Sequence, residues 1–213
     1  MAKLYFKYGV MGSSKSAQAL IAKFNYEEGG HNVLVLKPAT DTRDGKDVVK
    51  SRIGLSGKAI MVESDIDIYE KFFLGNECWP DVIICDESQF FTEAQIEQLK
   101  DIAVKFEIPV LCYGLLTDFQ TKLFPGSKRL IELADSVQEI KMVCDCGKKA
   151  SVNARLVEGK VTVEGEQVFI GGNESYKAMC YECWKNSLND HTIVNMAEYI
   201  NTKATATTDF VDF

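Results

Sequence analysis

The chain lacks the features that would place it in several common classes of protein. It has no apolar run near the roughly 20 residues of a membrane span, and its start, MAKLYFKYGV, is too short for a secretory signal peptide. Basic residues are outnumbered, with 24 Lys and Arg against 31 Asp and Glu and a formal net charge of -7. This balance argues against a protein that acts on duplex nucleic acid. The two histidines, His31 and His191, complete no obvious catalytic group. We therefore expect a cytoplasmic protein with no membrane or nucleic-acid partner.

A disulfide framework is also not expected, because the seven cysteines occur without a secretory signal. In a reducing compartment, spaced cysteines are more often metal ligands. Cys144 and Cys146 form a C-x-C pair, and Cys180 and Cys183 form the more usual C-x-x-C pair. Four thiolates at the base of a hairpin suit a closed, tetrahedral, structural zinc site. Four free thiols are the alternative.

The first part of the chain alternates β-rich apolar runs with segments of helical periodicity. The expected strands are 4–9, 32–39, 81–88 and 109–115, and the expected helices are 15–30, 66–73 and 92–107. Thr92 followed by Gln95 predicts a capping box on the last of these helices. This alternation predicts an α/β fold with a parallel sheet and helices on both faces.

The pattern changes after about residue 140. Residues 154–172, ARLVEGKVTVEGEQVFIGG, show β alternation with glycine turns, which predicts a hairpin between the two cysteine pairs. We expect a nucleotide-binding domain over residues 1–140 and a zinc-binding β appendage over 141–190. The threonine-rich tail, 191–213, lacks periodicity and is expected to be loose.

Residues 8–20, YGVMGSSKSAQAL, nearly match the phosphate-loop pattern G-x-x-x-x-G-K-[ST]. Gly9, Lys15 and Ser16 fall on the pattern, but Ser14 replaces its second glycine. Backbone N–H groups at such a helix start attract phosphate even in an acidic protein. Lys15 would contact the phosphates and Ser16 would bind magnesium. A chance run of serines at a helix start, where serine is a favoured cap, is the alternative.

Acidic and basic residues follow two of the expected strands. Asp86 and Glu87 end a buried strand, where the acid of a phosphate-loop protein holds magnesium and a second carboxylate can act on a substrate hydroxyl. Asp41 and Arg43 follow the strand at 32–39, and Arg43 suits the charge that develops on a transferring phosphoryl group. Solvated loop acids and a surface turn of mixed charge are the alternatives.

Together these residues resemble the thymidine kinase family of the type found in many bacteria and in animal cytosol. The resemblance covers residues 3–186 and implies a P-loop, RecA-like α/β fold with a small zinc-ribbon-like appendage. Its motifs are the loop at 9–16, D-T-R at 41–43, D-E-S-Q-F at 86–90, CYGLLTDFQTKLF at 112–124, I-G-G-N-E-S-Y at 170–176 and the four cysteines.

The resemblance implies transfer of the γ-phosphate of ATP to the 5′-hydroxyl of thymidine, with Mg²⁺ and a structural Zn²⁺. Glu87 would be the general base, assisted by Lys15 and Arg43. Mg²⁺ would lie near Ser16, Asp86 and Asp41. The implied phosphate-binding residues are Gly9, Val10, Met11, Gly12, Ser13, Ser14, Lys15 and Ser16.

In the family, a loop that corresponds to residues 164–178 closes over the base, recognises thymine mainly through backbone groups and has an aromatic roof. The implied nucleoside-binding residues are Met11, Phe90, Leu115, Phe119, Phe124, Phe169, Ile170, Gly171, Gly172 and Tyr176. Core packing is the alternative role, above all for Leu115 and Phe124. Members of the family are usually homotetramers that the deoxynucleoside triphosphate inhibits.

Two other functions remain open. One is a nucleotide-binding relative with impaired turnover, which Ser14 would mark. The other is a zinc-ribbon protein that binds nucleic acid, which the acidic composition disfavours. The presence of Glu87 beside Asp86 favours an enzyme, because a protein that only binds nucleotide needs no general base.

Overall fold

The computed structural model describes residues 2–41, 45, 47–75, 78–167 and 175–190. Its main feature is a six-stranded sheet in the order β5-β2-β6-β7-β1-β8, in which every neighbouring pair is parallel. The strands are β1 (Leu4–Tyr8), β2 (Val33–Pro38), β5 (Ile60–Val62), β6 (Val82–Cys85), β7 (Val110–Gly114) and β8 (Ser136–Glu139). The predicted parallel sheet is therefore confirmed.

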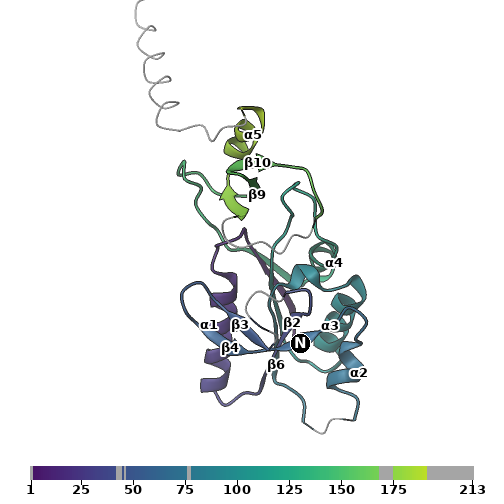
Figure 1. Ribbon diagram of the computed structural model, residues 1–213. Helices are drawn as coiled ribbons and strands as arrows, with labels where there is room; N and C mark the ends of the chain where they lie inside the picture. The colour runs from purple at the N-terminus through teal and green to yellow at the C-terminus, as the bar shows by residue number, and fades with distance from the viewer. Residues whose placement is uncertain (1, 42–44, 46, 76–77, 168–174, 191–213) are drawn as a thin grey trace, which may run out of the picture.

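Helices cover both faces of this sheet, as the alternating pattern predicted (Figure 1). The first helix, α1 (Lys15–Glu28), packs on one face. The other face carries α2 (Ile68–Phe72), α3 (Glu93–Lys105) and α4 (Pro125–Leu133). Strand β6 shows why its sequence is continuously apolar: Ile83 and Cys85 face one core while Val82 and Ile84 face the other.

Local sequence signals account for several element boundaries. Helix α3 begins at the predicted capping box, where Gln95 N donates to Thr92 Oγ1 at 3.2 Å and Thr92 N donates to Gln95 Oε1 at 3.1 Å. The predicted strand at 81–88 is wrong in its last part. The chain leaves β6 after Cys85, Glu87 adopts a left-handed conformation with φ 49°, and the short 3₁₀ helix η1 (Ser88–Phe90) follows. This early turn brings the two acids out of the sheet.

Residues of the second half build a smaller antiparallel sheet in the order β10-β9-β11. Its strands are β9 (Val152–Val157), β10 (Lys160–Thr162) and β11 (Tyr176–Met179), and helix α5 (Tyr181–Asp190) follows. The β9–β10 pair confirms the predicted hairpin. A further pair, β3 (Val48–Lys50) and β4 (Ser56–Lys58), extends beside α1. The tail at 191–213 lies outside the described residues.

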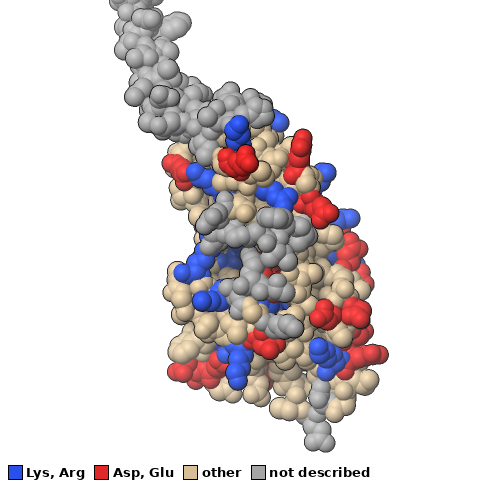
Figure 2. All heavy atoms as spheres, viewed as in Figure 1, with Lys and Arg blue, Asp and Glu red and all other residues tan. Residues whose placement is uncertain are grey.

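We call the described residues up to 140 the large lobe and the described residues from 141 onward the small lobe. Figure 1 shows the small lobe at one end of the large one. Within the described residues, no helix has the length and apolar character needed to cross a membrane. On the face in Figure 2, acidic and basic side chains are interspersed over the described surface, without a continuous basic patch.

Candidate active site between the two lobes

A cavity of about 750 Å³ opens at the carboxyl ends of the parallel strands. The loops after β1, β2, β6 and β7 line it, and the small lobe closes one side. Many of the predicted site residues share this cavity: Met11, Gly12, Ser14, Lys15, Ser16, Asp41, Asp86, Glu87, Phe90, Leu115, Phe119, Phe124 and Tyr176. Elements far apart in the sequence therefore meet at one concave site.

The phosphate loop runs from β1 into α1 and is tightly packed. A Cβ atom on Gly9 would lie 2.5 Å from Ile140 O and from Ser13 Oγ, so only glycine fits there. Lys15 is buried, and its Nζ donates to Val10 O at 2.8 Å, so the ammonium group lies within the curve of the loop. Gly9, Val10 and Ser13 do not line the cavity and instead shape the loop from behind.

Ser14 adopts the conformation that a glycine would provide. Its backbone has φ 63° and ψ 23°, in the left-handed region, and Gly12 also has a positive φ of 83°. The Ser14 side chain does not cap α1; its hydroxyl donates to Ser13 O at 2.6 Å. The loop thus keeps its shape with serine at this position, at the cost of a backbone conformation that L-residues seldom adopt.

Asp86 lies at the floor of the cavity beside the start of α1. It is buried, its N–H donates to Leu36 O at 3.0 Å, and the Ser16 hydroxyl donates to its carboxylate. Burial, and then the neighbouring charge of Glu87, raise the pKa of Asp86 to about 7. Hydrogen bonds and the Lys15 ammonium act in the opposite direction. A buried carboxylate and a hydroxyl side by side are oxygen ligands of the type that Mg²⁺ prefers.

Glu87 follows directly, and a glutamine orients it. Gln89 Nε2 donates to Glu87 Oε2 at 2.6 Å, and Gln89 Oε1 accepts from Leu115 N at 2.9 Å. Gln89 is itself buried. The left-handed backbone at Glu87 is a second sparsely populated conformation in this cavity, and such conformations gather at functional sites. Sequence reasoning missed Gln89, although it belongs to the quoted D-E-S-Q-F motif.

Asp41 reaches the same cavity from the end of β2, where a buried lysine holds it. Lys37 Nζ lies 3.6 Å from Asp41 Oδ2 and donates to Gly45 O at 3.0 Å and Val48 O at 3.1 Å. Lys37 was not predicted, although a lysine within the apolar run NVLVLKPA was the available signal. Arg43 lies outside the described residues.

Aromatic side chains form another part of the cavity wall. Phe90 and Phe124 meet edge to face with ring centroids 5.6 Å apart. Phe119 packs under Arg155, whose guanidinium carbon lies 4.6 Å from its centroid and 5.8 Å from that of Tyr176. Phe124 and Phe119 are buried, yet both line the cavity, so packing and lining are not exclusive roles. Phe169, Ile170, Gly171 and Gly172 lie outside the described residues.

The small lobe adds polar side chains that sequence reasoning did not identify. Asn153 and Gln167 line the cavity, and Arg155 packs on Phe119; all three lie among residues that carry no motif in the sequence. Gln167 Nε2 donates to Asp118 Oδ2 at 2.8 Å, and Arg155 Nη1 donates to Glu166 O at 3.0 Å. Their roles depend on the docking of the two lobes, which no local pattern encodes.

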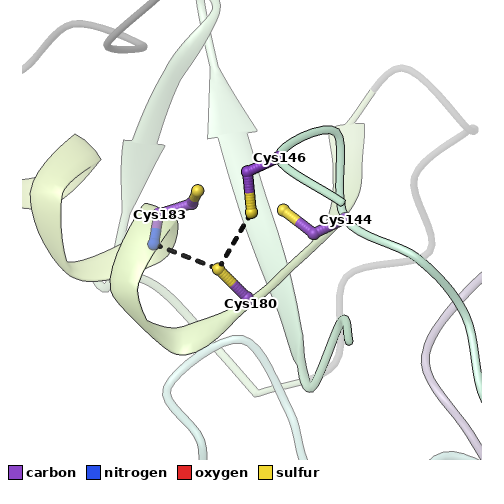
Figure 3. A group of neighbouring side chains, drawn as sticks. All are labelled: Cys144, Cys146, Cys180 and Cys183. Atoms are coloured by element: carbon purple, nitrogen blue, oxygen red, sulfur yellow. Dashed lines mark hydrogen bonds between the residues drawn. The ribbon is translucent and has the colours of Figure 1, made fainter. Parts of the chain in front are cut away.

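The four predicted zinc ligands converge in the small lobe (Figure 3). Their Sγ atoms all lie within 4.8 Å of one another, and Cys146 Sγ lies 3.6 Å from Cys180 Sγ. Zn–S bonds of about 2.3 Å in a tetrahedron place the sulfurs about 3.8 Å apart, so the cluster fits one zinc ion. Cys144 and Cys146 lie in a tight turn, in which Gly147 N donates to Cys144 O at 2.8 Å. This turn lets the short C-x-C pair direct both thiols to one point.

The thiols of this cluster differ in acidity. The backbone N–H of Lys148 is the main cause that lowers the pKa of Cys146 to about 7. Burial raises the pKa of Cys180 and of Cys183. The three cysteines outside the cluster were expected to be core residues, which is confirmed for Cys85 and Cys112, fully buried neighbours across β6 and β7, but is wrong for Cys78, which is exposed.

Comparison with known proteins agrees with this site. A family model described as "Thymidine kinase" matches residues 2–184. The thymidine kinase of Enterobacteria phage T4 is 47% identical over 187 residues, which cover 86% of this chain and 96% of that protein. That of Streptococcus pyogenes serotype M3 (strain MGAS315) is 43% identical over 187 residues, covering 87% of this chain and 98% of that protein. That of Rhizobium etli is 43% identical over 192 residues, covering 89% of this chain and 96% of that protein.

A solved structure with a related shape is the Pif1 helicase from Candida albicans, with a TM-score of 0.36 and 15% identity. The match covers 65% of this chain and 36% of that chain. A likeness of this size carries no argument about fold or function.

Proposed function

This chain belongs to the thymidine kinase family, and we propose that it transfers the γ-phosphate of ATP to the 5′-hydroxyl of thymidine. One observation supports this most directly. Lys15 of the phosphate loop and the adjacent acids Asp86 and Glu87 after β6, from two separate segments, line one cavity together with Phe90, Phe119, Phe124 and Tyr176. A phosphate site and an aromatic base site therefore share one cavity of about 750 Å³, which is large enough for both substrates.

On the phosphate side, the loop at 9–16 holds the triphosphate through backbone N–H groups and the start of α1. Lys15 supplies positive charge within the loop, and Arg43 would add to it from the segment after β2. Ser16, Asp86 and Asp41 offer the oxygens for Mg²⁺. When bound, the ion would neutralise charge on the phosphate oxygens.

On the acceptor side, Glu87 accepts the proton of the thymidine 5′-hydroxyl as the oxygen attacks the γ-phosphorus and ADP leaves. Gln89 holds one carboxylate oxygen of Glu87, which fixes the direction of the other. Phe90, Phe119, Phe124, Leu115 and Tyr176 enclose the base by apolar and stacking contacts. Residues 169–172 would complete this enclosure through their backbone groups.

The four-cysteine cluster fits a structural zinc, which would fix the turn at 143–149 to the start of α5. We also propose that the chain acts in the cytoplasm as a homotetramer, as the resemblance to the family implies. Exposed apolar side chains on α1, Ile21 at 47% and Phe24 at 60%, offer surface for such contacts. The domain limits that we propose remain 1–140, 141–190 and 191–213.

The test is an assay of the purified protein with ATP and magnesium against a panel of nucleosides, scored for 5′-monophosphate by mass spectrometry. We expect thymidine to be phosphorylated, and the panel to show whether deoxyuridine is as well. Binding of Mg–ATP without any monophosphate product would instead support the nucleotide-binding relative with impaired turnover. Binding of single-stranded DNA or RNA without phosphorylation would support the zinc-ribbon alternative.

A further inference from the structure

The small lobe packs directly against the phosphate loop. Val10, a residue of that loop, belongs to the same buried apolar cluster as Cys144, Val152 and Met179 of the small lobe. A Cβ atom on Gly12 would lie 3.2 Å from Met142 Sδ, so the two segments approach closely at a second point. The cluster that surrounds the cysteines is thus continuous with the back of the loop.

One polar side chain completes this contact. Asn153 on β9 is only 3% exposed, and its Oδ1 accepts from Met11 N at 2.7 Å. Its Nδ2 donates to Thr117 O at 3.0 Å, in the segment that leads to Phe119. Both ends of the amide are therefore occupied by the large lobe, although Asn153 itself belongs to a strand of the small lobe.

The Met11 N–H and the Val10 carbonyl are the two ends of a single peptide unit. Lys15 Nζ donates to that carbonyl at 2.8 Å, and Ser13 N donates to it at 3.2 Å. In a trans peptide the C=O and N–H bonds point in opposite directions. Asn153 therefore holds one end of the peptide plane while Lys15 contacts the other. Rotation of this plane would move the carbonyl that orients the Lys15 ammonium.

We propose that Asn153 is a positioning residue through which the small lobe sets the geometry of the phosphate loop, so that the affinity for Mg–ATP depends on the docking of the small lobe. This inference rests on the proposed function of the loop. It assigns the small lobe a role toward the phosphates, in addition to its role as a cover for the nucleoside. Asn153 also lines the cavity, but both of its polar ends are engaged by protein, so the role proposed for it acts through Met11 and Lys15.

The test compares Asn153→Ala with Val152→Ala in direct titrations of Mg–ATP without nucleoside. Loss of the acceptor leaves the partly buried Met11 N–H without its protein partner, and we expect the dissociation constant for Mg–ATP to rise about tenfold. The apparent KM for thymidine should change less than the apparent KM for ATP. Val152 lies on the same strand and packs in the apolar cluster with Val10, but it forms no side-chain hydrogen bond to the loop, so Val152→Ala should weaken Mg–ATP affinity clearly less than Asn153→Ala.

Two results would overturn the proposal. One is wild-type affinity for Mg–ATP in Asn153→Ala; the other is equal weakening in Val152→Ala, which would reveal a general loosening of the lobe. Should Asn153→Ala fail to fold, Asn153→Ser, whose hydroxyl is too short to replace Oδ1, takes its place with the same expectation. Failure of the proposed function is distinct, because it would appear as absent thymidine phosphorylation in the wild-type protein.

Discussion

The two lobes divide the cavity unequally. Among the described lining residues, every charged side chain belongs to the large lobe: Lys15, Asp41, Lys50, Arg52, Asp86, Glu87 and Asp118. The small lobe contributes Asn153, Gln167 and Tyr176, which are uncharged. In the proposed reaction the large lobe therefore carries the groups for phosphoryl transfer, while the small lobe provides contacts that position and enclose the substrates.

The two lobes also differ in the buried apolar clusters that stabilise them. Two buried apolar clusters of 17 and nine residues cover the faces of the large sheet. The small lobe has one cluster of nine residues, which includes Cys144 and Cys180 and also Val10 of the large lobe. A core of that size seldom folds without a further link. The comparison indicates that the large lobe is stable through its apolar core, and that the small lobe depends on its four-cysteine cluster and its docking.

The largest expected effect tests the claim that the chemistry belongs to the large lobe. We expect Glu87→Gln to lower thymidine phosphorylation by roughly a hundredfold or more, the scale of a general base, because the amide cannot take the proton. Mg–ATP affinity should stay within a few-fold, since Glu87 is not part of the loop. Steady-state kinetics and direct titration would measure both. Glu97→Gln on the surface of α3 is the control, and full activity of Glu87→Gln would remove Glu87 from the mechanism.

The next effect tests whether the small lobe depends on its metal. Cys180→Ser should lower bound zinc from about one equivalent to well under one, because a tetrahedral site loses a thiolate. We expect phosphorylation to fall roughly tenfold as the small lobe loosens, while the helical signal of the large lobe in circular dichroism persists. Cys78→Ser, at an exposed cysteine outside the cluster, is the matched control. Wild-type protein that carries no zinc after gentle purification would contradict the metal site.

A smaller effect concerns strain within the large lobe. Ser14→Gly should leave the KM for ATP within about threefold and raise the free energy of unfolding by up to about 1 kcal/mol, because glycine adopts the left-handed conformation without a steric penalty. Ser14→Ala keeps the strained backbone but loses the bond to Ser13 O, so it should be less stable than Ser14→Gly. Chemical denaturation would compare them. A less stable or inactive Ser14→Gly would mean that the serine hydroxyl is required in this loop.

Sequence reasoning recovered the large lobe better than the interface between the lobes. Strand β6 and helix α3 follow from local signals, an apolar run and a capping box, and both were predicted nearly to the residue at their start. Helix α4 was missed, although Pro125 at its start was an available signal.

The cavity residues also differ in whether the sequence alone could identify them. Lys15, Asp86 and Glu87 stand in motifs with defined spacing, so the sequence alone identified them. Asn153 has no such motif, because its importance comes from a contact between residues 142 positions apart. Contacts of this kind follow from how two packed surfaces meet, and single-sequence patterns do not contain that information.

The smallest expected effect concerns a partly exposed ion pair beside β8, the edge strand of the large sheet. Asp135, just before β8, accepts from Leu4 N at 2.8 Å and pairs with Lys100 Nζ at 2.6 Å. The bond from Lys100, followed by the bond from the Leu4 N–H, lowers the pKa of Asp135. A carboxyl whose pKa is lower in the folded state stabilises the fold above its unfolded pKa of about 3.9, and this contribution disappears as the pH falls through the folded pKa.

Asp135→Asn should therefore be less stable than the wild type at pH 7, by no more than about 0.5 kcal/mol because the pair is partly exposed. The difference should vanish as the pH falls through the lowered folded pKa of Asp135, where the wild-type carboxyl becomes protonated. Denaturant titrations across this pH range would measure it, with the exposed Asp101→Asn as the control, for which no change is expected. If the free energy of unfolding fell several times more than this at pH 7, this edge of the sheet would depend on its ion pair more than on its apolar core. That result would contradict the conclusion that the apolar core stabilises the large lobe.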